Sequence, residues 1–98
     1  MDINKTEEIN SLLELYGELL TKKQRTVMNM YYVLDYSLSE IAENTKTSRA
    51  AVYDLIKRVN NTLKKYEKKL HLLEKRKKIV KLIERLPNKT KKEIEELI

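Results

Sequence analysis

Apolar residues recur along this chain at intervals of three and four, the spacing that places side chains on one face of an α-helix. The longest run occupies positions 52, 56, 59, 63, 66, 70, 73, 77 and 80, which are Val, Ile, Val, Leu, Tyr, Leu, Leu, Lys and Val. This is a heptad stripe with one basic residue in it. It predicts either one long helix over residues 48–86 or two helices that break near residues 60–61 or 70–71. The stripe must be covered, either by the first helix or by a second copy of the chain.

Two shorter helices are predicted before this run. The first, over residues 6 to 20, has Thr6 as its cap and Gly17 in its interior, and its apolar face contains Ile9, Leu12, Leu13, Tyr16, Leu19 and Leu20. Glycine weakens a helix by about 1 kcal/mol relative to alanine, so we expect a close neighbour at Gly17. Thr21 and Gln24 form a capping box and open a second helix, with the apolar residues Val27, Met28, Met30, Tyr31 and Leu34.

Residues 37–59 contain two further helix starts separated by a short polar interruption. Ser37 and Glu40 form a capping box, and Ser48 is a second N-cap. Leu38 and Ile41 are the inward residues of the first of these helices, with the small Ala42 at the crossing, and those of the second are Val52, Leu55, Ile56 and Val59. Two helices joined by three or four residues form the unit that places its second helix in a major groove. A plain helical hairpin is the alternative.

The predicted interruption consists of Asn44, Thr45, Lys46 and Thr47. The turn of such a unit usually contains glycine or asparagine, because one of its residues adopts the left-handed conformation. Apolar residues would also seal the angle between the helices better than threonines. We therefore expect a somewhat loose turn.

The end of the chain predicts a stop and one more helix. Pro87 and Asn88 end the long helical region, and Thr90 with Glu93 caps a short last helix that contains Ile94, Leu97 and Ile98. The predicted fold is all-α. A helix-turn-helix domain occupies residues 1–59, with its turn unit at 37–59, and a basic amphipathic helical extension over residues 60–98 continues the same domain.

Charge changes this picture more than composition does. The net charge is +6 over 98 residues. Residues 1–56 contain six Lys and Arg against nine Asp and Glu, residues 57–85 twelve against three, and residues 87–98 three against three. A helical segment of net charge +9 is expected where a chain meets a polyanion such as nucleic acid. The alternative is a solvated face that keeps the protein soluble.

The composition also excludes several classes of protein. The chain has no cysteine, which removes disulfides and thiolate metal sites. Its first ten residues are acidic and polar, unlike a signal peptide, and no apolar run is long enough to span a bilayer. We expect a cytoplasmic protein with no membrane insertion.

The candidate binding residues lie on the second helix of the turn unit and on its continuation. Arg49 is placed to reach a base edge or a phosphate, and Tyr53 either stacks on an unpaired base or packs at an edge. Asp54 would repel phosphate unless it accepts from a cytosine amine or pairs with Arg58. The complete candidate set is Ser48, Arg49, Ala50, Tyr53, Lys57, Arg58, Lys64, Lys65 and Lys68.

The sequence contains few of the residue combinations that catalytic sites use. His71 is the single histidine, no glycine-rich loop is present, and no spaced carboxylate pair stands out. Tyr31, Tyr32 and Tyr36 cluster beside the turn unit, where core and rim packing is expected rather than a binding cage. We therefore predict no enzyme activity, no cofactor and no metal site.

Several motifs resemble known families. LTxKQR, SLxEIA and SRxxV are similar to the promoter-reading C-terminal module of bacterial sigma factors. Over roughly residues 7 to 86 the chain more closely resembles the YlxM-type family of small helix-turn-helix proteins. The motifs that carry this resemblance are LYxxLLTxKQ at Leu15 to Gln24, the pair Tyr31 and Tyr32, SLSEIAE at Ser37 to Glu43, SRxAVYDxIKR at Ser48 to Arg58, and LxxYExKLxLLEK at Leu63 to Lys75. The turn departs from the family pattern, because Thr45, Lys46 and Thr47 replace an apolar residue, a Gly or Asn, and a Val.

The resemblance implies a regulatory protein of low-GC bacteria associated with the signal recognition particle, its GTPase and its RNA, and it is compatible with a homodimer through the long helix. Three functions remain open. The first is a non-catalytic nucleic-acid-binding accessory of the particle in protein targeting. The second is a transcription regulator that reads duplex DNA, and the third is an adaptor whose apolar stripe binds a partner helix.

Overall fold

The computed structural model describes residues 3–98, which form six α-helices and one short 3-10 helix and contain no β-strand. The prediction of an all-α fold is confirmed. The elements are α1 (Ile3–Tyr16), η1 (Gly17–Leu19), α2 (Lys22–Tyr32), α3 (Leu38–Thr45), α4 (Arg49–Leu70), α5 (Leu72–Leu82) and α6 (Asn88–Glu95). No helix within residues 3–98 is both long and apolar enough to cross a membrane.

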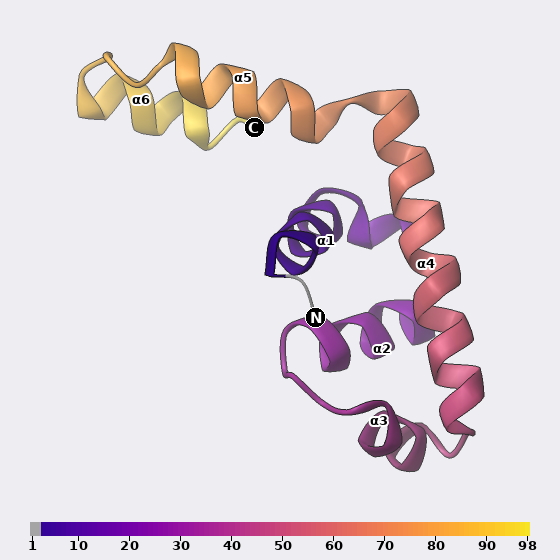
Figure 1. Ribbon diagram of the computed structural model, residues 1–98. Coiled ribbons are helices and arrows are strands. Elements are labelled where there is room, and N and C mark those ends of the chain that lie inside the picture. Colours follow the sequence, from indigo (N-terminus) through magenta and orange to yellow (C-terminus); the bar gives the residue numbers. More distant parts are fainter. Residues whose placement is uncertain (1–2) are drawn as a thin grey trace.

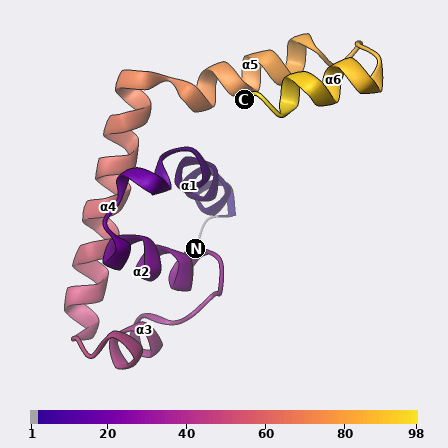
Figure 2. The same ribbon diagram turned by 180° about the vertical axis from the view of Figure 1, so that it is seen from behind.

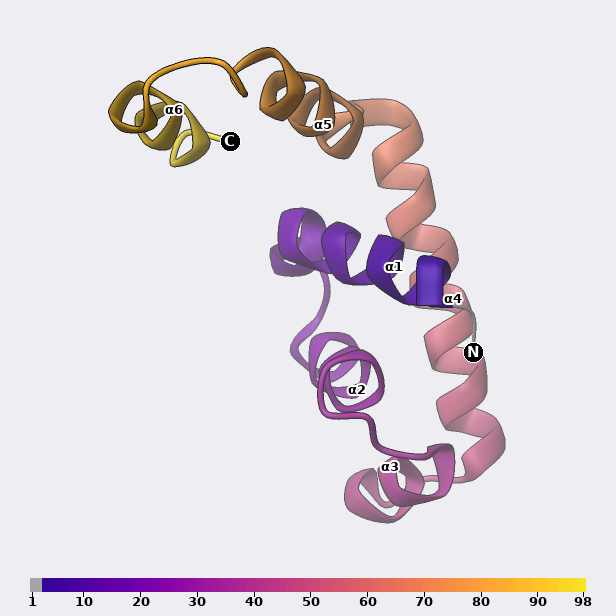
Figure 3. The same cartoon turned by 60° about the vertical axis from the view of Figure 1, so that its left-hand side comes forward.

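The helices are arranged around α4. Helices α1, α2 and α3 lie one below another along one flank of α4 (Figure 1), and the view from behind shows the same order (Figure 2). Beyond α4 the chain turns sharply into α5, which leads away from α4, and after a short connection α6 returns in roughly the opposite direction (Figure 1 and Figure 3). We call residues 72–98 the arm. The molecule measures 50 × 25 × 25 Å with a radius of gyration of 16.0 Å, whereas a compact domain of this length would have about 13 Å.

The core forms where the three shorter helices meet α4. Its residues are apolar, come from α1 to α5 and include Ile9, Leu12, Tyr16, Leu20, Val27, Met28, Ile41, Ala42, Val52, Ile56, Val59, Leu63 and Leu73. Ile41 and Ala42 of α3 and Val52 and Ile56 of α4 belong to this core, so α3 is packed against α4 as in a helix-turn-helix. The first half of the heptad stripe is therefore covered within one chain.

The second half of the stripe is only partly covered. Leu73 is buried at the start of α5, but Leu70 is 46% exposed, Lys77 lies on the surface, and Val80 is 38% exposed. Leu82 and Leu97 of the arm are also largely exposed. The described part of the chain thus provides cover for α4 but little for the arm.

The long helical region breaks at His71, one of the alternatives that the stripe allowed. His71 adopts the left-handed conformation with φ 56° and ψ 28°, while residues 60–61 lie inside the uninterrupted α4. No glycine or proline causes the bend, so hydrogen bonds must hold it.

Those hydrogen bonds centre on Glu67, near the end of α4. Its Oε1 accepts from the backbone N–H of Leu73 at 2.9 Å, and its Oε2 accepts from the N–H of Glu74 at 3.1 Å. The buried Tyr16 donates its hydroxyl to Glu67 Oε1 at 2.7 Å and accepts from the N–H of Leu72 at 3.1 Å. Glu67 and Tyr16 therefore satisfy the free donors at the start of α5, the role that a cap residue usually plays. We call the group formed by Tyr16, Glu67 and the first backbone N–H groups of α5, those of Leu72, Leu73 and Glu74, the corner.

Both side chains of the corner have shifted pKa values. Burial raises the pKa of Tyr16, and its hydrogen bond to Glu67 adds to the rise, since ionised tyrosine would face a carboxylate. Burial alone would raise the pKa of Glu67, but the hydrogen bonds from Tyr16, Leu73 and Glu74 favour the carboxylate and lower its pKa overall. The geometry is thus made for neutral tyrosine and ionised glutamate.

The predicted helix starts at Thr21, Ser37 and Ser48 are confirmed. Both capping boxes are complete, with side-chain to backbone distances of 3.0 and 3.1 Å in each. Ser48 accepts from the N–H of Ala51 at 3.1 Å. The hydrogen bonds with Ser37 lower the pKa of Glu40.

Other predictions about helix ends were wrong. Thr6 lies inside α1, which already includes Ile3 and ends at Tyr16, and Thr90 lies inside α6, which follows Pro87 directly. A Cβ at Gly17 would have no atom of residues 3–98 within 4 Å, so no described neighbour requires this glycine. The Gly17 carbonyl instead accepts from the Nε–H of Arg25 at 3.1 Å. The predicted inward residues Leu19 and Leu34 are exposed.

Candidate nucleic-acid interface

The turn between α3 and α4 is built from residues 46–48. Lys46 takes the left-handed conformation, with φ 56° and ψ 44°. The N–H of Thr47 donates to the Ala42 carbonyl at 3.0 Å, and the N–H of Lys46 donates to the Glu43 carbonyl at 3.3 Å. This pair of bonds is the Schellman arrangement that ends many helices. A lysine therefore performs here what glycine usually performs.

Two threonines close the same turn with their hydroxyl groups. Thr45 donates to the carbonyl of Ile41 at 2.7 Å, and the hydroxyls of Thr45 and Thr47 lie within hydrogen-bonding distance at 3.1 Å. These polar contacts lie where the sequence lacks the apolar residues that would otherwise seal the angle between the two helices. The start of α4 is consequently held at a defined angle to α3.

The first turns of α4 present their outer face to solvent. Arg49, Ala50 and Lys57 are exposed, and Tyr53 is 58% exposed, too open to count as core. Ser48 lies at the same end, but its hydroxyl oxygen is engaged in capping α4. The free positive end of the α4 dipole adds to the attraction of this end for anions.

Asp54 pairs with Arg58 one turn further on. Arg58 Nε lies 2.9 Å from Asp54 Oδ2, and both side chains are mostly exposed. Such a pair contributes only up to about 1 kcal/mol to stability, but it neutralises the one acidic side chain on this face. It also engages one of the two predicted arginines, which leaves Arg49 without a carboxylate partner among the described residues.

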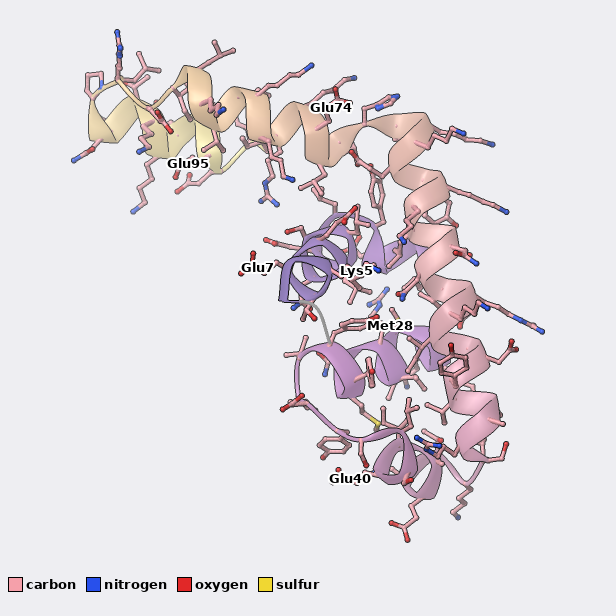
Figure 4. All side chains as sticks on the ribbon, in the orientation of Figure 1. Lys5, Glu7, Met28, Glu40, Glu74 and Glu95 are labelled. Atoms are coloured by element: carbon pink, nitrogen blue, oxygen red, sulfur yellow. The ribbon has the colours of Figure 1, made fainter. Side chains whose placement is uncertain are left out.

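Three lysines continue the face along α4. Lys57, Lys64 and Lys68 are separated by seven and four residues, so they share one side of the helix, and all are exposed. We call them the lysine row. With 1.5 Å of rise per residue, the distance from Arg49 to Lys68 is about 28 Å along the axis. Lys65 is exposed beside the row. Figure 4 shows that several nitrogen-tipped side chains of α4 point away from α1, α2 and α3.

The tyrosine cluster behaves as predicted. Tyr31, Tyr32 and Tyr36 are half-buried at the rim of the core, and the rings of Tyr31 and Tyr32 meet edge to face with centroids 4.9 Å apart. His71 is paired through Nδ1 with Glu74 at 3.0 Å. Within the described residues, no group of three His, Asp or Glu side chains could hold a metal ion.

Comparison with known proteins identifies the family. A family model described as "Putative helix-turn-helix protein, YlxM / p13 like", of the family UPF0122, matches residues 3–98. The chain belongs to UPF0122. The resemblance seen in the sequence motifs is thereby confirmed at the level of the family, and the description is that of a helix-turn-helix protein rather than of an enzyme.

Individual UPF0122 proteins align over most of the chain. One from Oceanobacillus iheyensis is 55% identical over 84 residues, which are 86% of this chain and 80% of the relative. Those of Pediococcus pentosaceus and Clostridium kluyveri are each 58% identical, over 73 and 71 residues. These stretches are 74% and 72% of this chain and 65% and 64% of the relatives, so the chain covers slightly less than two thirds of the latter two proteins.

The geometry and the family agree at a coarse level. This UPF0122 chain has a helix-turn-helix, the unit with which proteins bind nucleic acid. The structure brings all nine predicted site residues onto α4 or its cap. Sequence reasoning did not single out Asn60, whose Nδ2 donates to the Tyr32 hydroxyl at 2.9 Å. Its contact with Tyr32, 28 residues earlier, depends on tertiary packing that no local pattern reveals.

Proposed function

We propose that this protein is a non-catalytic, cytoplasmic regulator that binds nucleic acid with α4 as an accessory of the signal recognition particle in protein targeting. The observation that carries the proposal is the series of exposed basic side chains, Arg49 and the lysine row, on one continuous helix. One end of that helix is fixed by a helix-turn-helix, and the other end extends past it.

The two ends of α4 suit different contacts. In helix-turn-helix proteins, the first residues of the second helix contact base edges, the place that Arg49, Ala50 and Tyr53 occupy. Lys64, Lys65 and Lys68 lie too far along α4 for the same groove and suit phosphates instead. The ligand should therefore offer both a groove or loop for the helix end and a phosphate backbone beside it.

Structured RNA fits this description best, and we propose the RNA of the signal recognition particle. The support is the resemblance to the YlxM-type family, together with an exposed aromatic side chain, Tyr53, at the reading end. The GTPase of the particle is a second proposed partner, on the resemblance alone. A homodimer through α4 has less support, since α1, α2 and α3 already cover its apolar side.

Reading of duplex DNA is the second candidate function. It is favoured by Arg49 in the first turn of α4, since arginine pairs with guanine in a major groove. The Asp54–Arg58 pair removes the electrostatic objection to this reading. On this reading, Arg49→Ala would relax sequence preference by about 1–3 kcal/mol.

The deciding experiment titrates the particle RNA and a duplex DNA of equal length at two salt concentrations with nonspecific competitor. We expect selective binding of the RNA, with a salt dependence that flattens by about one unit of slope for each of Lys64→Ala and Lys68→Ala. Lys89→Ala, an exposed lysine on α6, is the matched control and should leave the slope unchanged.

Two results would contradict the proposal. Equal binding of RNA and DNA, lost in competitor, would mean that the basic segment is a mere polycation. Tighter binding of one DNA sequence than of the RNA would instead support the transcription regulator.

A further inference from the structure

A small cleft opens where α2, α3 and α4 meet, next to the helix-turn-helix. Its volume is about 220 Å³. Its lining residues are the tyrosines Tyr31, Tyr32 and Tyr53, the apolar residues Leu38 and Ile56, and the polar residues Lys57 and Asn60. We call it the tyrosine cleft. It belongs to the same surface as Arg49, because Leu38 and Tyr53 also line a shallow depression beside Arg49 and Ala50.

One polar atom of the cleft residues lacks a partner. Asn60 donates through Nδ2 to the Tyr32 hydroxyl, but its Oδ1 is buried and accepts no hydrogen bond from the residues that the structure describes. Buried polar atoms are nearly always paired in folded proteins. Because Oδ1 has almost no exposed surface, a ligand N–H would reach it only after a small movement of the Asn60 side chain toward the cleft, and it would then gain more than an apolar ligand would.

The cleft also continues into the lysine row. Lys57 lies both in the cleft lining and in the row, and Asn60 and Tyr31 line a neighbouring cleft of about 290 Å³ that includes Lys64. A ligand seated in the tyrosine cleft would thus lie near Lys57 and Lys64, while Glu8 and Lys5 of the neighbouring cleft carry opposite charges. An anionic, flat, N–H-bearing ligand matches these features better than a neutral or aliphatic one.

A nucleobase attached to its phosphate backbone combines all three properties. Every base has a face that stacks on an aromatic ring, and adenine, cytosine and guanine have an exocyclic amine that donates a hydrogen bond. Bases within a duplex are stacked and cannot enter a cleft sideways, whereas bases in loops and bulges can be turned outward.

We propose that the tyrosine cleft binds one unpaired nucleobase, with Tyr53 as the stacking platform, Asn60 Oδ1 as the acceptor for the base amine, and Lys57 and Lys64 on the flanking phosphates. The proposal rests on the proposed function and deepens it. It specifies that the preferred ligand is an RNA with an unpaired base beside a helical segment, rather than a plain duplex.

The test compares an RNA hairpin containing an unpaired adenine with a fully paired RNA duplex of equal length and charge, at matched salt. The wild-type protein should bind the hairpin more tightly, and Tyr53→Ala should weaken hairpin binding about fivefold to a hundredfold with no change in duplex binding or in salt dependence. Tyr53→Phe retains the ring and should behave like the wild type. Tyr53 is largely exposed, so neither variant should disturb folding.

A second comparison tests Asn60 without altering the protein. Replacing the unpaired adenine by purine, which lacks the amine, should weaken binding about twofold to tenfold. No loss would overturn the role of Asn60.

The outcomes separate this proposal from the function on which it rests. If hairpin and duplex bind equally, and Tyr53→Ala weakens both or neither while the lysine variants still flatten the salt dependence, the cleft proposal fails and the function stands. If the lysine variants also change nothing, both fail.

Discussion

Lys46 shows how a single backbone conformation sets the geometry of the reading helix. A side chain in the left-handed region costs roughly 1–2 kcal/mol relative to the right-handed helical region, and glycine would avoid this cost. Lys46 remains there because the bonds to Ala42 and Glu43 need its conformation. Its side chain is exposed, so it can be replaced without loss of packing.

Lys46→Gly is expected to stabilise the protein by about 0.5–1 kcal/mol, the relief of the left-handed conformation exceeding the added chain entropy of the unfolded state. The measurement is the urea midpoint of unfolding by circular dichroism. Lys46→Ala is the control for the loss of the charge alone and should not stabilise. A lower midpoint for the glycine variant would show that the lysine side chain contributes a contact of its own.

At the scale of single residues, the sequence predicts those features that depend only on residues a few positions away in the chain. The caps at Thr21, Ser37 and Ser48 follow from residues three positions apart, and the left-handed turn follows from the helix-turn-helix pattern itself. The closing contact of Thr45 with Thr47 depends on rotamers, and the open space at Gly17 depends on a neighbour that is absent. Neither can be inferred from spacing.

At the scale of elements, the break between α4 and α5 depends mainly on a residue that is distant in the sequence. The heptad stripe runs through residues 70–71 without interruption, and neither glycine nor proline marks the site. The bend is held by Tyr16, which lies 51 residues before Glu67. The sequence could name the break only as one alternative, because the partner that stabilises it comes from α1.

Tyr16→Phe is therefore expected to destabilise the protein by about 1–3 kcal/mol, since Glu67 loses a donor and the N–H of Leu72 loses its acceptor. The loss should appear as a lower urea midpoint and as faster amide exchange at Leu72 and Leu73 than elsewhere. Tyr66→Phe is the matched control. The Tyr66 ring lies 5.9 Å from that of Tyr16, but its hydroxyl has no hydrogen bond among the described residues, so removing it should change little.

If both variants have the same stability, the hydroxyl of Tyr16 does not hold the bend. In that case the apolar contacts of Leu73 with the core would remain as the cause.

The shape of the whole molecule depends on that same corner. The arm has few buried residues of its own, Leu73 and Ile83, and it is joined to α1 by the corner and by a weak contact of 3.7 Å between Arg76 and Glu14. Figure 4 places the labelled Glu74 just past the bend, at the start of the arm. Loosening the corner should thus change the overall dimensions before it unfolds the core.

Acid is expected to loosen the arm. The pKa of Glu67 is lowered in the folded state, so the stability it contributes is present at neutral pH and is lost as the pH falls below about 4.5, the ordinary glutamate value, through the lowered pKa. The raised pKa of Tyr16 has the opposite consequence, with stability lost as the pH rises above about 10. Small-angle scattering should show a radius of gyration above 16.0 Å in acid while α2 amides remain protected from exchange.

The control for this prediction is Glu67→Gln, which has no carboxylate to protonate at this position. Its radius should already be larger at neutral pH and should change less in acid. Because the lowered pKa values of Glu40 and Glu74 also respond to acid, a variant that follows the wild-type curve would assign the transition to those groups instead.

The sequence predicts much more of the helix-turn-helix half of the molecule than of the half that contains the arm. The all-α fold, the helix-turn-helix and the placement of the nine candidate residues on one helix follow from periodicity and caps. The direction of the arm does not, because a heptad stripe continues equally well in a straight helix, and the tyrosine cleft does not, because Tyr31, Leu38 and Asn60 meet only in three dimensions.

The long separation between Tyr16 and its partners also has a consequence for the order in which the chain can fold during synthesis. The apolar face of α1 is covered by side chains of α4 and α5, the last of which is Leu73. At roughly 5–20 residues per second, a ribosome needs roughly 3–11 s after Tyr16 to produce Leu72. Until then α1 can pack only against elements that have already been synthesised, such as α2 and the growing α4, and it lacks the part of its cover that α5 supplies.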